Sequence, residues 1–164
     1  MGGFGFIDQI TAYQKGESLE ALFTLKGQEE FLQDHFEGFP VMPGVLMIEA
    51  MRQAASHLLA LSSNLQEPAY RLVRAENVRF GQFVKPGSLL RITAQLAAEQ
   101  SSIGTKVDGR IELVSCQGIG AGTRAISAKL TLVPVFAEDQ QKTRMRQNIR
   151  LLLECIRQER QDLS

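Results

Sequence analysis

Hydrophobic and polar residues alternate along several short stretches of the chain, and this two-residue period predicts β-strands with one buried face. The first two strands are predicted over residues 4–13 and 18–26, with a polar break at residues 14–17 between them. Three more alternating stretches follow one another further along the chain, over residues 90–96, 106–113 and 126–132. Because these strands succeed one another without intervening helices, they predict an antiparallel sheet.

One long helix is predicted between the opening pair of strands and the others, over residues 45–61. Its apolar residues cover most of its circumference, which is typical of a helix that is buried on nearly every side. The exceptions are Glu49, Arg52, Gln53 and Ser56, whose spacing places them on a single polar stripe. A mostly apolar helix within an antiparallel sheet predicts an α+β fold in which the sheet curls around the helix.

The last part of the chain, from Asp139 onward, is highly charged and has the period of a helix. Met145, Ile149, Leu152 and Ile156 recur at helical spacing and form a narrow apolar seam. We therefore expect a C-terminal helix that packs on the sheet or on a neighbouring molecule. Residues 1–138 are expected to form the main body of the domain, and residues 139–164 a helical extension of it.

Length, charge and cysteine content restrict the class of protein. The 164 residues suffice for one domain with a hydrophobic core. Lys plus Arg equals Asp plus Glu at 18 each, so the chain as a whole does not attract nucleic acid or an acidic membrane. No signal peptide is recognisable, and no apolar run reaches the roughly 18 residues of a membrane span. Cys116 and Cys155 lack metal-ligand spacing. We expect a cytoplasmic protein without metal, cofactor, nucleic acid or membrane.

A loop rich in glycine and proline precedes the long helix and contains His35. The stretch of residues 35–54 resembles the signature of bacterial 3-hydroxyacyl-acyl-carrier-protein dehydratases. That signature is a histidine followed by Phe-x-Gly-x-Pro-x-x-Pro-Gly, then an acidic residue 14 positions after the histidine, then Gln four positions later. Here the acidic residue is Glu49 and the glutamine is Gln53. A weaker likeness extends over residues 4–134.

The resemblance implies the hotdog fold and the removal of water from 3-hydroxyacyl thioesters on acyl carrier protein. Such a reaction needs a base for the C2 proton, an acid for the C3 hydroxyl and donors for the thioester oxygen. His35 suits the base, and Glu49 suits the acid if apolar surroundings raise its pKa. The N–H groups of Gly44 and Val45 at the helix N-terminus suit the thioester oxygen. Gln53, one turn after Glu49, suits the orientation of that carboxylate.

The same resemblance implies a homodimer, or a larger homo-oligomer, in which His35 of one subunit faces Glu49 of the other. Family members commonly have Gly and Pro where this chain has Asp34 and Glu37, and most lack the C-terminal helix. Glu rather than Asp at position 49 favours a general dehydratase over an isomerising relative. His57, outside the motif, is interpreted as structural. Acyl carrier proteins are acidic, and candidate basic docking residues are Arg71, Arg74, Arg79, Lys85 and Arg124.

Two functions other than dehydration are also compatible with the sequence. A hotdog thioesterase would use an acidic helix residue to activate water and would not need His35. A non-catalytic, acyl-binding scaffold subunit would use the additional C-terminal helix to recruit a partner.

Overall fold

The computed structural model describes residues 5–99, 101–114, 122–136 and 138–161, with side chains of the last helix as far as Leu153. Cys116 and the side chains of Cys155 and Ile156 lie outside this part of the chain. The elements begin with β1 (Gln9–Gln14), β2 (Ser18–Thr24), the 3-10 helix η1 (Glu30–Leu32) and the long helix α1 (Gly44–Ser62). They continue with β3 (Tyr70–Phe80), β4 (Leu89–Leu96), β5 (Thr105–Leu113), β6 (Thr123–Pro134) and α2 (Asp139–Gln161).

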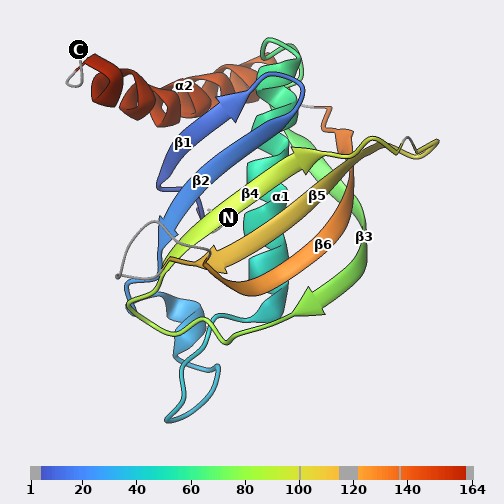
Figure 1. Ribbon diagram of the computed structural model, residues 1–164. Coiled ribbons are helices and arrows are strands. Elements are labelled where there is room, and N and C mark those ends of the chain that lie inside the picture. Colours follow the sequence, from blue (N-terminus) through green and yellow to red (C-terminus); the bar gives the residue numbers. More distant parts are fainter. Residues whose placement is uncertain (1–4, 100, 115–121, 137, 162–164) are drawn as a thin grey trace.

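The described strands form one antiparallel sheet in the order β1-β2-β4-β5-β6-β3. The sheet curls around α1, which runs along its concave face (Figure 1). Alternate residues of the central strands point at the helix and are buried, as the alternating sequence predicted. The expected α+β arrangement of a sheet around a central helix is therefore confirmed.

A glycine in β5 allows α1 to pack closely against the middle of the sheet. A Cβ atom on Gly109 would lie 3.0 Å from Sδ of Met51, a fully buried residue of the helix. A larger residue at position 109 would push the helix away from the sheet. This contact fixes the helix that carries the candidate catalytic carboxylate.

The opening of the chain differs from the predicted strand over residues 4–13, because residues 5–8 precede the first strand, which begins at Gln9. Residue 4 lies outside the described residues. Phe6 donates its backbone N–H to Oε1 of Gln53 on α1, at 2.9 Å. The carboxylate of Asp8 accepts the backbone N–H of Thr24 at 2.7 Å, and the N–H of Asp8 donates to the carbonyl of Leu22 in β2 at 2.8 Å. The segment before Gln9 is thus bound both to the helix and to β2, although its described residues are not part of a strand.

The C-terminal helix α2 crosses the molecule beside β1 and the C-terminal end of α1 (Figure 1). Ile149 is 1% exposed, and Leu152 packs against the same core. Arg146 donates from Nε to the backbone oxygen of Leu65 at 2.8 Å. The predicted helix and its apolar seam are thus confirmed as far as the side chains are described. Among the described residues, no helix combines the length and the apolar character that a bilayer crossing requires.

Candidate active site

The polar stripe of α1 is a connected hydrogen-bond network centred on Glu49. Arg52 binds this carboxylate with two nitrogens, Nε to Oε2 and Nη2 to Oε1, each at 2.7 Å. Gln53 donates from Nε2 to Oε1 of Glu49 at 3.1 Å. Residues three and four positions apart share a helix face, which explains why both reach the same carboxylate. A bidentate guanidinium pair holds the carboxylate in one orientation.

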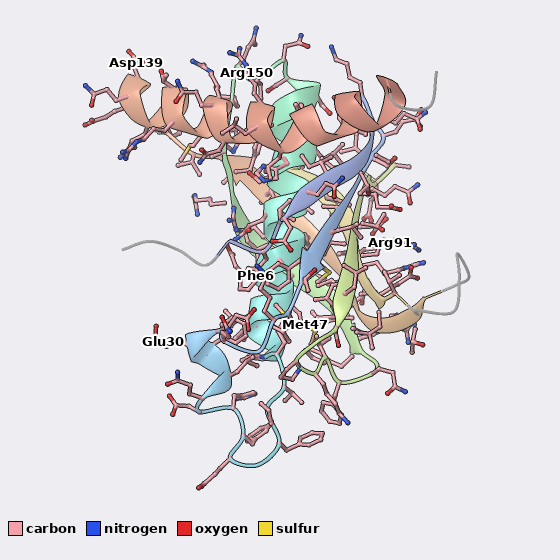
Figure 2. All side chains as sticks on the ribbon, turned by 90° about the vertical axis from the view of Figure 1, so that its left-hand side faces the viewer. Phe6, Glu30, Met47, Arg91, Asp139 and Arg150 are labelled. Carbon is pink, nitrogen blue, oxygen red and sulfur yellow. The ribbon has the colours of Figure 1, made fainter. Side chains whose placement is uncertain are left out.

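The stripe lies between the two edges of the curled sheet, because it is bonded to both. On one side, Gln53 accepts the N–H of Phe6, which precedes β1 and lies beside α1 (Figure 2). On the other side, Arg52 donates from Nη1 to the carbonyl of Tyr70 at 2.7 Å, and Oγ of Ser56 accepts the N–H of Tyr70 at 2.9 Å. Tyr70 begins the edge strand β3. Glu49 is half-buried, and it therefore lies on the side of α1 that faces the open space between the two sheet edges, away from the sheet itself.

The expectation that apolar surroundings raise the pKa of Glu49 is wrong for the single chain. Burial does raise it, but the hydrogen bonds from Arg52 and Gln53 and the positive charge of Arg52 outweigh that effect. The pKa of Glu49 consequently lies below its ordinary value. The carboxylate is the resting form of this group.

His35 lies in the segment between η1 and α1, which projects as a loop beyond the end of the sheet (Figure 1). Its ring stacks on that of Phe36 with 4.2 Å between centroids, and its carbonyl accepts the N–H of Val41 at 2.8 Å. Within the described part of the chain, no hydrogen bond or ion pair joins His35 to Glu49. The loop thus presents the imidazole at the surface, half-buried.

Gly44 and Val45 are the first two residues of α1, after Pro43 as its N-cap. First-turn N–H groups have no intrahelical acceptor, so these two donors are available to an oxyanion. The ring of Phe80 occupies the space beside Gly44, since a Cβ atom there would lie 2.6 Å from its Cε1. Phe80 is 59% exposed and Val45 72% exposed. The helix N-terminus is therefore bordered by exposed apolar side chains. Phe80 is one of them, and its place beside Gly44 was not predicted from the sequence.

Substitution of Gly44 by valine is expected to reduce turnover more than stability. The new side chain meets only the outer end of the exposed Phe80 ring, which can turn away, so the loss of folding free energy is small. Both side chains then crowd the N–H groups where a thioester oxygen would bind. Thermal melting and kinetics on one sample test this. A loss of activity only in step with the folded fraction would mean that Gly44 is a turn residue.

The structure brings together Glu49 and Gln53 as the motif spacing predicted, and it adds Arg52 to them. On the sequence, Arg52 belongs to the polar stripe but has no predicted role. Its position three residues after Glu49 was the available signal, because an acidic and a basic residue at that interval pair on a helix. His57 was interpreted as structural, and its Nδ1 is buried without a hydrogen-bond partner among the described residues.

A family model described as the FabA-like domain matches residues 2–115. The 3-hydroxyacyl-[acyl-carrier-protein] dehydratase FabZ of Levilactobacillus brevis is 34% identical over 135 residues, which cover 82% of this chain and 86% of that protein. FabZ of Shewanella loihica is 38% identical over 133 residues, covering 76% and 85%.

Solved structures resemble the chain in fold. The dehydratase heterocomplex ApeI:P from Xenorhabdus doucetiae superposes with a TM-score of 0.55 at 20% identity, covering 75% of this chain and 95% of that one. An uncharacterised protein from Erwinia carotovora gives 0.58 at 20% identity, covering 77% and 91%. Together with the family match, these similarities confirm the hotdog fold.

Proposed function

The chain belongs to the FabA-like domain family, and from this membership we propose that it is a 3-hydroxyacyl-acyl-carrier-protein dehydratase of fatty acid biosynthesis. It removes water from 3-hydroxyacyl thioesters and yields trans-2-enoyl thioesters. The relatives named FabZ support this assignment over most of the chain. The observation that carries it is the position of Glu49, held by Arg52 and Gln53 one turn beyond a helix N-terminus with free N–H groups.

In the proposed mechanism, His35 and Glu49 exchange protons with the substrate during the reaction. Dehydration leaves His35 protonated and Glu49 ionised, so His35 then releases a proton to water and Glu49 takes one up before the next dehydration. In dehydration, neutral His35 takes the C2 proton, protonated Glu49 gives a proton to the departing C3 hydroxyl, and the N–H groups of Gly44 and Val45 stabilise the thioester oxygen. In hydration, the ionised Glu49 accepts a proton from the attacking water, and protonated His35 returns one to C2. The pair with Arg52 favours the protonation state that starts hydration.

The proposed enzyme is a homodimer, or a larger homo-oligomer, with His35 of one subunit facing Glu49 of the other. Two features support this. The His35 loop projects from its own subunit (Figure 1) and has no bond to Glu49 of the same chain among the described residues. Glu49 in turn faces the open side of the fold, between the sheet edges, where a second subunit can approach.

Acyl carrier protein is the proposed carrier of the substrate, and basic residues near the helix N-terminus are its proposed dock. Arg79 directly precedes Phe80, whose ring lies beside Gly44. Arg79 and Arg124 line one depression of about 570 Å³ on the sheet surface. Lys85 extends over the ring of Phe39 in the projecting loop, with Nζ 5.0 Å from its centre. An acidic carrier bound at these cations would deliver its thioester close to Gly44 and Val45.

Hydration of a crotonyl thioester by the purified wild-type chain tests the proposed function against its alternatives. A dehydratase converts crotonyl to 3-hydroxybutyryl thioester without release of free thiol. A thioesterase releases the thiol, and a scaffold subunit does neither. Absence of hydration with both crotonyl coenzyme A and crotonyl acyl carrier protein would refute the proposal.

Substitution of Arg52 by alanine is expected to move the acid limb of the hydration profile to higher pH. The arginine lowers the pKa of Glu49 by hydrogen bonding and by charge, so its removal raises that pKa. Hydration needs ionised Glu49, and its rate therefore begins to fall at a higher pH than in the wild type. The measurement is kcat/KM against pH for crotonyl thioester. Arg52→Lys, which keeps the charge, should restore part of the shift; a uniformly lower profile of unchanged shape would contradict the role of Arg52.

A further inference from the structure

On the side of β1, the hydrogen-bond network around Glu49 reaches a backbone group from outside α1. The N–H of Phe6 donates to Oε1 of Gln53 at 2.9 Å, and Nε2 of the same amide donates to Oε1 of Glu49 at 3.1 Å. Phe6 precedes β1 and lies beside α1 (Figure 2). A segment outside the motif of residues 35–54 therefore contacts the amide that binds the candidate catalytic carboxylate.

The two groups on either side of the Gln53 amide have fixed hydrogen-bonding character. A backbone N–H can only donate, and an ionised carboxylate can only accept. Glu49 is ionised in its resting form, because its lowered pKa favours the carboxylate. Both contacts are satisfied when the amide oxygen faces Phe6 and the amide NH₂ group faces Glu49, whereas the reverse orientation places like groups together at both ends. The N–H of Phe6 thus holds the amide in the orientation in which it donates to Glu49.

Phe6 is itself held by contacts that do not involve Gln53. Its side chain is 1% exposed, and its ring packs edge-on against that of Phe23 in β2, with 5.4 Å between centroids. The ring of Phe31 in η1 lies 6.1 Å away on the same measure. Two residues later, Asp8 is bonded to β2 through both its N–H and its carboxylate. The donor is therefore fixed by the core, as a group that orients a site residue must be.

Charge on the surrounding elements leaves this hydrogen bond with a distinct effect. Within the described part of the chain, Arg52 is the residue whose charge acts on Glu49. The ionisable residues around it are exposed or neutral, namely Asp8 before β1, Glu30 on η1, His57 on α1 and Arg71 on β3. Burial, together with the charge of Arg52, lowers the pKa of His57 to about 4, so its ring is uncharged at neutral pH. The bond from Gln53 is therefore the contribution to the pKa of Glu49 on which the segment before β1 acts.

We propose that the backbone N–H of Phe6 is a positioning group of the enzyme: by binding Oε1 of Gln53, it keeps the amide NH₂ directed at Glu49 and stabilises the ionised carboxylate. The proposal rests on the catalytic role proposed above for Glu49. Any residue except proline supplies a backbone N–H, so a sequence motif does not reveal such a group. Without it the amide is free to turn, and the pKa of Glu49 rises because Gln53 donates to it less.

Replacement of Phe6 by phenyllactic acid, its α-hydroxy analogue, tests the proposal, because it exchanges the N–H for an ester oxygen and keeps the buried ring. An ester oxygen cannot donate, so it no longer binds Oε1 of Gln53. The acid limb of crotonyl thioester hydration should move to higher pH, since hydration needs ionised Glu49. The basic limb of dehydration should move to higher pH as well, since that direction needs protonated Glu49. Limbs at their wild-type positions in the folded ester variant would overturn the proposal.

The α-hydroxy analogue of isoleucine at position 7 is the matched control. It makes the same backbone change one residue later, where the N–H of Ile7 has no hydrogen bond to α1 among the described residues. This variant should keep the wild-type pH profile, and a shift equal to that of the Phe6 ester would contradict the proposal.

A double substitution shows whether the ester acts through Gln53. Gln53→Met removes the amide and should move the same limbs to higher pH. Adding the Phe6 ester to Gln53→Met should then cause no further shift, because both changes break one chain of contacts. A further shift of the same size as in the wild-type background would exclude the route through Gln53.

A direct titration separates this proposal from the function on which it rests. In protein labelled at the glutamate carboxyl carbons, the NMR signal that is lost in Glu49→Gln identifies Glu49. Its titration midpoint should lie at higher pH in the Phe6 ester than in wild type and in the Ile7 ester. Equal midpoints in all three would overturn the proposal and leave the dehydratase function intact. The expected difference in a protein inactive towards every enoyl and 3-hydroxyacyl thioester would refute the dehydratase function and leave the positioning contact standing.

Discussion

Glu49→Gln and His35→Ala are each expected to lower dehydratase turnover by about a hundredfold or more. Each variant removes a group that transfers a proton in the proposed reaction, and a positioned acid or base typically contributes a factor of this size. Neither change should unfold the protein, because His35 lies on a projecting loop and Glu49 on the open face of α1. Turnover of crotonyl thioester and thermal melting, measured on the same purified samples, check both expectations.

Glu30→Gln is the matched control for the loss of a carboxylate. Glu30 is exposed on η1 and points away from α1 (Figure 2), so this variant should keep wild-type turnover. Near-wild-type activity in either Glu49→Gln or His35→Ala would refute the assignment of that residue. The thioesterase alternative makes a different prediction, since it requires that His35→Ala keeps hydrolysing thioesters.

Strands with one buried face could be predicted from the sequence, and the edge strand β3 could not. In β2 and β4 every second residue is buried, and this regularity is what a two-residue period detects. β3 has irregular pairing with β6 between Leu72 and Arg74 and again between Glu76 and Arg79. Asn77, which lies within the second irregular stretch, has a positive φ of 52°. Such irregularities change which residues face the core, so the alternation is lost although the pairing is not.

The candidate site was predictable as far as helical geometry determines it. The interval of four residues placed Gln53 on the face of Glu49, and the structure shows their hydrogen bond. The lowered pKa of Glu49 was not predicted, although the two residues that lower it, Arg52 and Gln53, lie on the same helix three and four positions away. The guanidinium of Arg52 is also held by the carbonyl of Tyr70, which comes from another part of the chain. A sequence pattern describes one element, so this second contact of Arg52 was not predictable.

The helix α2 shows the same distinction. Its amphipathic seam predicted that one face is buried, and Ile149 confirms this. The surface it covers, beside β1, follows from tertiary packing alone. The division of the chain at residue 138 into a main body and an extension stays a prediction, as does the pairing of subunits.

Mixing the two inactive variants should restore about a quarter of wild-type activity if the sites are shared between subunits. In a heterodimer of His35→Ala with Glu49→Gln, one site receives both defects. The other site receives wild-type His35 from one chain and wild-type Glu49 from its partner, so it is intact. Random pairing of equal amounts makes about half of the dimers mixed, and half of their sites are then active.

The measurement is turnover after the two variants are unfolded together and refolded, with each variant refolded alone as the control. Native mass spectrometry gives the fraction of heterodimers, and the recovered activity should rise in proportion to that fraction. If His35 and Glu49 of the same chain formed the site, every site in every dimer would carry one defect, and mixing would restore nothing. A refolded mixture that contains heterodimers and stays as inactive as its parents would therefore exclude shared sites, while the hundredfold losses in the single variants would still identify the residues.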